Sequence, residues 1–135
     1  NFSSTDSYIF SDNIEHINIR GFLNAADIEQ RIRNSPVWRR GTDISKALES
    51  LLNKRHSLIN SSTILLIVSD AKTINSDEAL GNIKEIKGKV KRILWLNPIP
   101  EKDWSKIKNI EEFRKYCNML DCSTLEKLAK VCINI

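Results

Sequence analysis

The spacing of apolar residues along this chain switches between the period of a strand and the period of a helix. Residues 7–10 form a short β-prone run, and residues 16–20 alternate apolar and polar positions, as a half-buried strand does. The turn-forming residues 11–13 lie between these two runs. The pattern therefore predicts a β-hairpin near the N-terminus.

Two helices are predicted next. The helix at residues 25–33 has apolar residues four positions apart and is expected to stop before Pro36, because the residue before a proline disfavours helical backbone. The second helix takes either Thr42 or Asp43 as its N-cap. Its apolar residues recur on one helix face, and they are Ile44, Ala47, Leu48, Leu51, Leu52 and Leu58.

Two strands built on continuous apolar runs are predicted next, at residues 64–68 and 92–97. Neither run alternates, which is typical of parallel strands covered on both faces. Pro98 ends the second run. A helix capped by Ser76 and ending near Gly88 is expected to connect the two strands as parallel neighbours. Its residues expected to face the sheet are Leu80, Ile83 and Ile86.

The C-terminal part of the sequence predicts a helix, a strand and a last helix. Apolar residues recur with helical spacing from Trp104 to Tyr116, with a break near Asn109. Residues 119–122 form a candidate strand, and residues 123–126 form a capping box that opens the last helix. The expected core face of that helix is Leu125, Leu128, Ala129 and Cys132.

The order of these elements is β-β-α-α-β-α-β-α-β-α. It predicts an α/β protein with a doubly wound, mostly parallel sheet flanked by helices. With 135 residues, of which 41% are hydrophobic, the chain is large enough for one core, so residues 1–135 are expected to form a single domain. The longest apolar run is strand-sized and far from the ~20 residues of a membrane-spanning helix. We therefore expect no membrane association.

The charge of the chain is basic, with a net charge of +4 and a sequence pI of about 9.0. Part of this charge is clustered at Arg31, Arg33, Arg39 and Arg40, which is compatible with an anionic partner. No nucleic-acid-binding motif accompanies the cluster. We therefore interpret it as a solvated surface and expect no nucleic acid partner.

The cysteines Cys117, Cys122 and Cys132 are odd in number and have no Cys-x-x-Cys spacing. Each lies in an apolar pattern, where a free cysteine behaves as a small hydrophobic residue. We therefore expect three buried, reduced thiols and a reducing, cytoplasmic location.

A candidate site follows from the order of the elements. Thr42 precedes the second helix, and Asp70 follows the strand at residues 64–68. Open α/β sheets bind ligands outside the carboxyl ends of their strands, so the two side chains are expected within a few ångströms of each other. A hydroxyl and a carboxylate are hard oxygen ligands that suit Mg²⁺ or Mn²⁺. Thr42 and Asp70 are therefore the candidate metal ligands.

At this point the sequence resembles a known family. Phe10-Ser11-Asp12 after a strand, Gly41-Thr42-Asp43-Ile44 at a helix start and Ser69-Asp70 at a strand end resemble a von Willebrand factor A (VWA) domain. Trp95-Leu96-Asn97-Pro98 is similar to the bacterial CoxE-like VWA group, associated with carbon monoxide dehydrogenase maturation. The resemblance covers nearly the whole chain. It implies a Rossmann-like fold with a metal ion-dependent adhesion site (MIDAS), in which Thr42 and Asp70 bind the metal.

The chain departs from the family pattern at two places. The resemblance implies a first strand followed by Asp-x-Ser-x-Ser, which supplies further metal ligands, and this sequence is not found in residues 1–135. We therefore interpret the chain as the C-terminal portion of a longer polypeptide whose first strand and helix precede Asn1. Binding of Mg²⁺ or Mn²⁺ is then expected to be weak or absent. The second departure is Ala71, because the family usually has glycine there, and glycine tolerates a positive φ.

The absent first strand has a structural consequence. In the fold that the resemblance implies, this strand is central and lies between the strands at residues 8–10 and 64–68. Without it, both of these strands expose a sheet edge. We therefore expect no direct pairing between them.

These expectations favour a metal-dependent protein-interaction domain that is not an enzyme. The resemblance implies a partner that presents an acidic residue to the metal, and a MoxR-type AAA+ ATPase as companion in protein or metallocofactor maturation. Two alternatives stay open: a Mg²⁺-dependent phosphotransfer or hydrolase domain, and a structural interaction domain with a degenerate metal site. The enzyme alternative has less support, because neither His16 nor His56 is expected near Asp70 and no glycine-rich phosphate loop is present.

Overall fold

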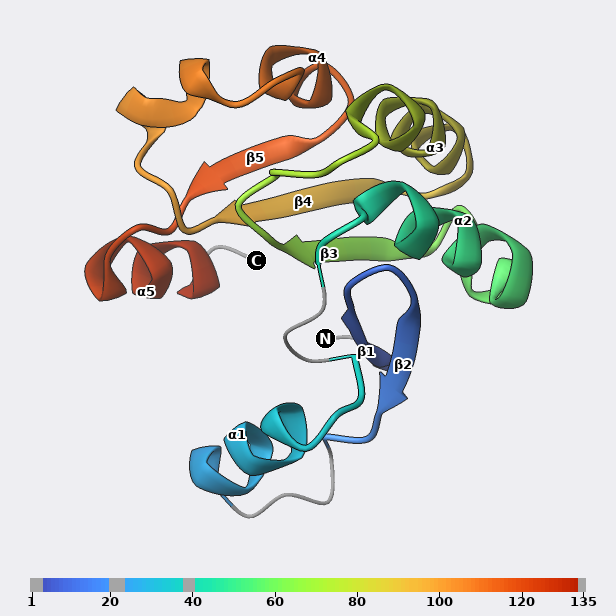
Figure 1. Cartoon of the computed structure of the whole chain (residues 1–135), viewed down its shortest axis with the longest axis vertical. Helices are drawn as coiled ribbons and strands as arrows, with labels where there is room; N and C mark the ends of the chain where they lie inside the picture. The colour runs from blue at the N-terminus through green and yellow to red at the C-terminus, as the bar shows by residue number, and fades with distance from the viewer. Residues whose placement is uncertain (1–3, 20–23, 38–40, 134–135) are drawn as a thin grey trace.

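The computed structural model describes residues 4–19, 24–37 and 41–133. Within these residues, no helix is long and apolar enough to cross a membrane. Figure 1 shows a small β-hairpin and a separate larger sheet with helices around it. The strands are β1 (Ser7–Phe10) and β2 (Ile14–Ile17) in the hairpin, and β3 (Ile64–Val68), β4 (Arg92–Asn97) and β5 (Asn118–Asp121) in the larger sheet.

The larger sheet is parallel throughout and has the order β3-β4-β5. β3 and β4 pair in a register that runs from Ile64 opposite Arg92 to Val68 opposite Leu96. Helix α3 (Ser76–Lys89) joins these two strands, because parallel neighbours need a crossover connection rather than a tight turn. The structure therefore confirms the predicted α/β class and the predicted parallel pairing.

The hairpin strands β1 and β2 are antiparallel, from Ser7 opposite Ile17 to Phe10 opposite Ile14. The prediction of a strand at residues 16–20 was wrong in position. Because the turn after β1 is tight, pairing resumes at once, and β2 begins and ends earlier than predicted. The last residue of the predicted strand lies outside the described residues.

The hairpin and the parallel sheet are separate sheets. No ladder joins β1 to β3 in the described part of the chain, and Figure 1 shows the hairpin beyond the β3 edge of the larger sheet. The expectation that these strands are not directly paired is confirmed. The two units are tied instead by the backbone N–H of Asp43, which donates to the Ser11 carbonyl oxygen at 2.9 Å, and by contacts of α2 (Ile44–Lys54) with β2.

The core lies on one face of the parallel sheet, where α2 packs against α3. The helix predicted from residue 44 ends at Lys54, and Leu58 lies in a separate 3₁₀ helix (His56–Leu58). The predicted inward residues of α2 and α3 are confirmed, with Leu51, Leu52 and Leu80 packed at the margin of the core. The buried cluster includes Ile44, Leu48, Ile67, Ala79, Ile83, Ile86, Ile93, Trp95, Phe113 and Met119.

The ends of α3 differ from the prediction. Asn75 is the N-cap residue, and Ser76 is the first helical residue, with its buried hydroxyl accepting from Asn109 Nδ2 at 3.3 Å. Gly88 lies within the helix rather than after it. The helix ends at Lys89, and the extended backbone of its C-cap residue Val90 leads toward β4, so no left-handed residue is needed there.

The predicted break near Asn109 is confirmed. A 3₁₀ helix (Glu101–Lys106) and α4 (Ile110–Arg114) flank it, and Asn109 has a left-handed φ of 63°. Trp104 is 2% exposed, and its indole N–H donates to the Ile99 carbonyl oxygen at 2.8 Å.

The second face of the sheet is covered only in part. β3 was predicted to be covered on both faces, but Leu66 is 47% exposed and Val68 is 63% exposed. Helix α5 (Leu125–Ile133) contacts β5 and has no buried residue. The predictions that β3 is covered on both faces and that α5 has a buried core face were both wrong. Among the described residues, nothing packs over this face of the sheet at β3. Of the predicted core face of α5, Leu128 is half-buried, whereas the exposed residues are Leu125, Ala129 and Cys132.

The start of α5 and the cysteines also need correction. Thr124, rather than Ser123, accepts the hydrogen bond from the backbone N–H of Lys127, at 3.2 Å. Cys117 is buried as predicted, and burial raises the pKa of its thiol to about 12. Cys122 is half-buried and Cys132 is exposed, because both lie on the partly covered side of the fold near α5.

Replacing Ile83 with alanine tests the core. Ile83 lies on α3 and is fully buried in the core. Ile83→Ala is therefore expected to lower the free energy of unfolding by about 2–5 kcal/mol. Urea denaturation measures this change. Ile74→Ala is the matched control, because Ile74 is 77% exposed, and it is expected to change stability by less than about 0.5 kcal/mol. Equal effects of the two changes would contradict the described core.

Candidate functional site

The first part of the candidate site is the segment before α2. Thr42 is exposed, whereas the next residue, Asp43, is 5% exposed. Asp43 is the N-cap of α2: its Oδ1 accepts from the backbone N–H of Ser45 at 3.2 Å and from the Ser45 hydroxyl at 2.6 Å. The sequence offered Thr42 or Asp43 as the N-cap of α2. Asp43 is the cap, so the Thr42 side chain does not cap the helix.

The second part is the loop after β3. Asp70 is half-buried, and its Oδ1 accepts from the backbone N–H of Lys72 at 3.0 Å. Between them, Ala71 is fully buried and has a φ of 63°, a left-handed conformation that an alanine adopts at a steric cost. The family resemblance implied glycine at this position, and the positive φ of Ala71 explains why glycine suits it.

Hydrogen bonds join these two segments. The Thr73 Oγ1 accepts from the backbone N–H of Ile44 at 2.9 Å, and Asn75 Nδ2 donates to Asp43 Oδ2 at 2.8 Å. The segments that carry Thr42 and Asp70 therefore meet at one edge of the sheet. The closeness of the Thr42 and Asp70 side chains themselves stays a prediction.

The ionisation of Asp43 follows from its partners. Burial by itself raises the pKa of this carboxyl group, but hydrogen bonds from Ser45, from the Lys46 backbone and from Asn75 outweigh it, with a further contribution from the Lys46 charge. The pKa of Asp43 therefore lies below its ordinary value. Asp43 is an anion in the folded protein at neutral pH and accepts hydrogen bonds through both oxygens.

The donor atoms of Thr42 and Asp70 have the chemistry that suits Mg²⁺ or Mn²⁺, but two donors are fewer than these ions require. A hydroxyl and a carboxylate are hard oxygen donors. No group of three or more His, Cys, Asp and Glu side chains in the described residues is placed to hold a metal ion. The two proposed oxygen donors are therefore too few for a complete Mg²⁺ coordination shell.

The histidines lie away from this edge. His16 on β2 pairs with Asp6 at 3.5 Å and packs edge-on against Tyr8. His56 follows the C-terminal end of α2, whereas Thr42 precedes its N-terminal end, and an eleven-residue helix spans about 16 Å. Neither histidine is placed as a general base beside Asp70.

The predicted basic cluster is partly neutralised. Arg31 pairs with Glu15 at 2.7 Å, and Arg33 pairs with Glu29 at 2.6 Å, both on or beside α1 (Ala25–Arg33). Arg39 and Arg40 lie outside the described residues.

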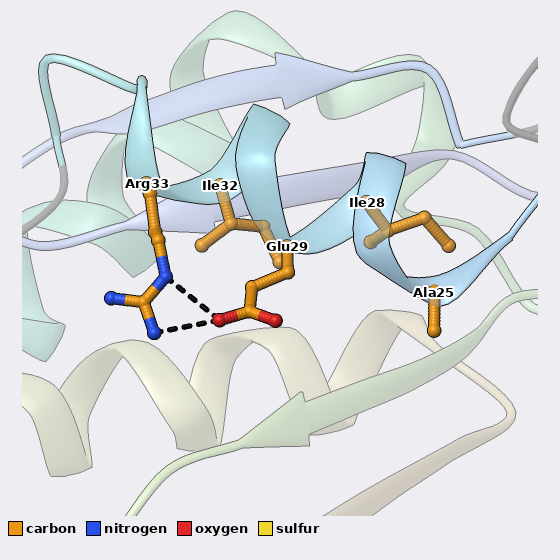
Figure 2. Close-up of a pocket in the computed structure, with 5 residues that line it drawn as sticks. All are labelled: Ala25, Ile28, Glu29, Ile32 and Arg33. Atoms are coloured by element: carbon orange, nitrogen blue, oxygen red, sulfur yellow. Dashed lines mark hydrogen bonds and ion pairs between the residues drawn. The ribbon is translucent and has the colours of Figure 1, made fainter.

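A surface hollow is formed by α1 alone. Figure 2 shows the Glu29–Arg33 pair beside the isoleucine side chains of this helix. Its lining is apolar apart from this pair, in which the Glu29 carboxylate is already bonded to Arg33. The lining residues are Ala25, Ile28, Glu29, Ile32 and Arg33.

The fold and the joined loops define the class of protein: an open α/β domain whose candidate ligands follow the carboxyl end of one parallel strand and precede a neighbouring helix. The family model described as a VWA domain containing CoxE-like protein matches residues 1–131. The chain therefore belongs to this family and has its Rossmann-like VWA fold. This match confirms the resemblance inferred from the sequence. Comparison with curated proteins and with solved structures gives no match.

Sequence reasoning missed the residues that join the loops. Asp43 was considered only as a cap, and neither Thr73 nor Asn75 was considered for a role at the site. The available signal was weak, because it consists of polar residues after a strand-ending Ser-Asp. Which of them reaches across to α2 depends on the three-dimensional path of the loop.

Ala71 provides a test of this loop. Ala71→Val adds a β-branched side chain at a positive φ in a fully buried position, so it is expected to destabilise the protein by about 2 kcal/mol or more. Ala71→Gly removes the steric cost but also a buried methyl group, so its stability is expected within about 1 kcal/mol of the wild type. Thermal unfolding of both variants checks this. A valine variant as stable as the glycine variant would contradict the described backbone.

Proposed function

We propose that this chain is a metal-dependent protein-interaction domain of the MIDAS type and that it acts by binding rather than by catalysis. The observation that carries the proposal is the pair of hydrogen bonds that join the Thr42 segment to the Asp70 loop at the carboxyl edge of the sheet. In open α/β sheets this edge is the usual place for a ligand. Thr42 and Asp70 are the proposed ligands of Mg²⁺ or Mn²⁺.

The remaining ligands are proposed to come from an Asp-x-Ser-x-Ser segment on a strand between β1 and β3. Two features support this position: β1 and β3 belong to different sheets, and no other described strand pairs with the β3 edge opposite β4. Leu66 and Val68 on β3 are also exposed. A strand placed there pairs with β3 and ends at the same edge as Asp70. Without it, Mg²⁺ keeps most of its water, because this ion dehydrates reluctantly.

The proposed partner is a protein that presents an acidic side chain. A bound Mg²⁺ offers an open coordination position that a partner carboxylate fills in place of water. Family membership favours a MoxR-type AAA+ ATPase as this partner, in protein or metallocofactor maturation. The protein supplies Thr42 and Asp70, held by the loop contacts, so that recognition depends on both the metal and the carboxylate.

The other two interpretations make different demands. A phosphotransfer or hydrolase domain needs a base or nucleophile beside Asp70, and both described histidines lie elsewhere, so no observation favours it. A degenerate metal site predicts that added ligands do not produce metal binding. The following experiment separates that interpretation from the proposal.

Metal binding is expected to depend on the added segment. The chain alone should bind Mn²⁺ weakly or not at all, because two protein oxygens do not replace enough of the hydration shell. Adding a peptide with an apolar strand that ends in Asp-x-Ser-x-Ser is expected to produce Mn²⁺ binding, measured by isothermal titration calorimetry. Thr42→Ala or Asp70→Ala should then weaken Mn²⁺ binding by about tenfold or more.

The controls separate metal ligation from strand addition. A peptide with alanine at the Asp and Ser positions should still pair with the chain but should not support Mn²⁺ binding. Ser62→Ala, an exposed position before β3, should leave the affinity unchanged. Equal Mn²⁺ affinity with both peptides would refute the MIDAS proposal.

Partner association is expected to require the metal. In the presence of the Asp-x-Ser-x-Ser peptide, binding of a MoxR-type ATPase to the immobilised chain should be lost on addition of EDTA and restored by Mg²⁺. Substitution of the partner's contacting acidic residue by its amide should have the same effect as the chelator, because an amide is a weaker ligand for a hard cation. Association that is insensitive to EDTA would argue for a structural interaction domain.

A further inference from the structure

One buried carboxylate lies at the centre of the candidate site without being a candidate ligand. Asp43 is 5% exposed, and both of its oxygens accept hydrogen bonds. Oδ1 is used within its own element, where it caps α2 through Ser45. Oδ2 is used across the fold, where it accepts from Asn75, the N-cap residue of α3.

Because each oxygen of Asp43 bonds to the start of a different helix, Asp43 links the N-terminal ends of α2 and α3. Asn75 is 32 positions away from Asp43 in the sequence. It ends the loop that begins with Asp70, and Asp43 directly follows Thr42. The Asp43–Asn75 hydrogen bond therefore spans the two segments that carry the proposed ligands.

Further hydrogen bonds lie next to the Asp43–Asn75 hydrogen bond. The Ile44 backbone donates to Thr73 Oγ1 at 2.9 Å, and Asn82 Nδ2 donates to the Ser45 carbonyl oxygen at 2.9 Å. The Asp43 backbone N–H donates to the Ser11 carbonyl oxygen in the hairpin turn. The hairpin turn and the loop before α3 thus both bond to Asp43 itself, and Thr73 and Asn82 bond to the two residues that follow it.

We propose that Asp43 is a positioning residue: through Asn75 it holds the Thr42 segment against the Asp70 loop before any metal binds. The preorganised arrangement lowers the cost of bringing the two proposed ligands together, as supporting hydrogen bonds do around metal ligands in general. The link itself stands on the hydrogen bonds, and only its consequence for metal affinity rests on the proposed function.

The pair allows a charge-swap experiment. Asn75→Asp places a second carboxylate against Asp43 and breaks the link by repulsion. Asp43→Asn combined with Asn75→Asp exchanges the two groups, so an amide again faces a carboxylate while the oxygen that caps Ser45 is kept. Asn53→Asp, at an exposed position on α2, is the matched control because it adds the same charge without this contact.

The readout is hydrogen–deuterium exchange of single amides, measured by NMR on the metal-free chain. In Asn75→Asp, the amides of Ile44 and Lys72, which bond within the site, are expected to exchange about tenfold faster, the size expected for loss of a charge-assisted hydrogen bond. The amides of β4 should keep their protection, because this effect is local. The double variant should return to within about twofold of the wild type, as a coupled pair requires.

Each outcome decides the proposal. An unchanged rate in Asn75→Asp, or a double variant as fast as Asn75→Asp, overturns it. If Asn75→Asp also exposes β4, Asn75→Ala removes the bond without added charge. It must then speed exchange at Ile44 and Lys72 while β4 stays protected, or the proposal fails.

A second measurement separates this inference from the proposed function. With the Asp-x-Ser-x-Ser peptide present, Mn²⁺ affinity should fall in Asn75→Asp and recover in the double variant, measured well below the unfolding temperature of each variant. A purely structural role does not change the affinity of chains that are fully folded at the temperature of the measurement. If the wild type binds no Mn²⁺ with the peptide, the metal function fails, whereas the positioning role of Asp43 is still decided by the exchange rates.

Discussion

The parallel pairing of β3 with β4 is the constraint on which the site depends. Its register places Val68 opposite Leu96, and the next residue, Ser69, continues the ladder by donating its backbone N–H to the Leu96 carbonyl oxygen at 3.2 Å. The buried Trp95 then donates its indole N–H to the Ser69 carbonyl oxygen at 2.9 Å. A core tryptophan thus fixes the point at which the chain leaves the sheet, and Asp70 is the first residue beyond it. A slip of this register by one residue would turn the strand over and move Asp70 away from the α2 segment.

Much of this arrangement was predictable because it depends on local patterns. The apolar runs at residues 64–68 and 92–97, the inward face of α3 and the break at Asn109 all follow from periodicity or a single turn signal, and the structure confirms them. The sequence also predicted that the motifs of Thr42 and Asp70 come from adjacent loops, and hydrogen bonds join these segments in the structure. The confirmed membership in the CoxE-like VWA family agrees with this reasoning.

The failures have a common physical cause, because they concern contacts between distant parts of the chain. The exposure of Val68 and Leu125 depends on what covers the second face of the sheet, and the hydrophobic pattern of a segment does not carry that information. The same holds for the bond between Asp43 and Asn75: its residues are ordinary helix-cap types, and only the fold brings them together. Capping residues were misassigned by one position because neighbouring polar residues offered equivalent hydrogen-bond acceptors.

The two sides of the candidate site are fixed by different kinds of contact. On the sheet side, the loop after β3 is fixed by the β4 ladder, by Trp95 and by the buried Ala71, whose left-handed backbone persists because the surrounding core leaves it no alternative. On the hairpin side, the Ser11 carbonyl oxygen accepts a backbone hydrogen bond from Asp43, and β1 pairs with β2 rather than with β3. Among the described strands, only β4 pairs with β3, so the β3 edge beside the hairpin has no strand partner there. It lies next to the exposed Leu66 and Val68, a combination that favours addition of a strand. In the proposed site, a strand added at this edge would bring its ligands to a loop that the core already fixes.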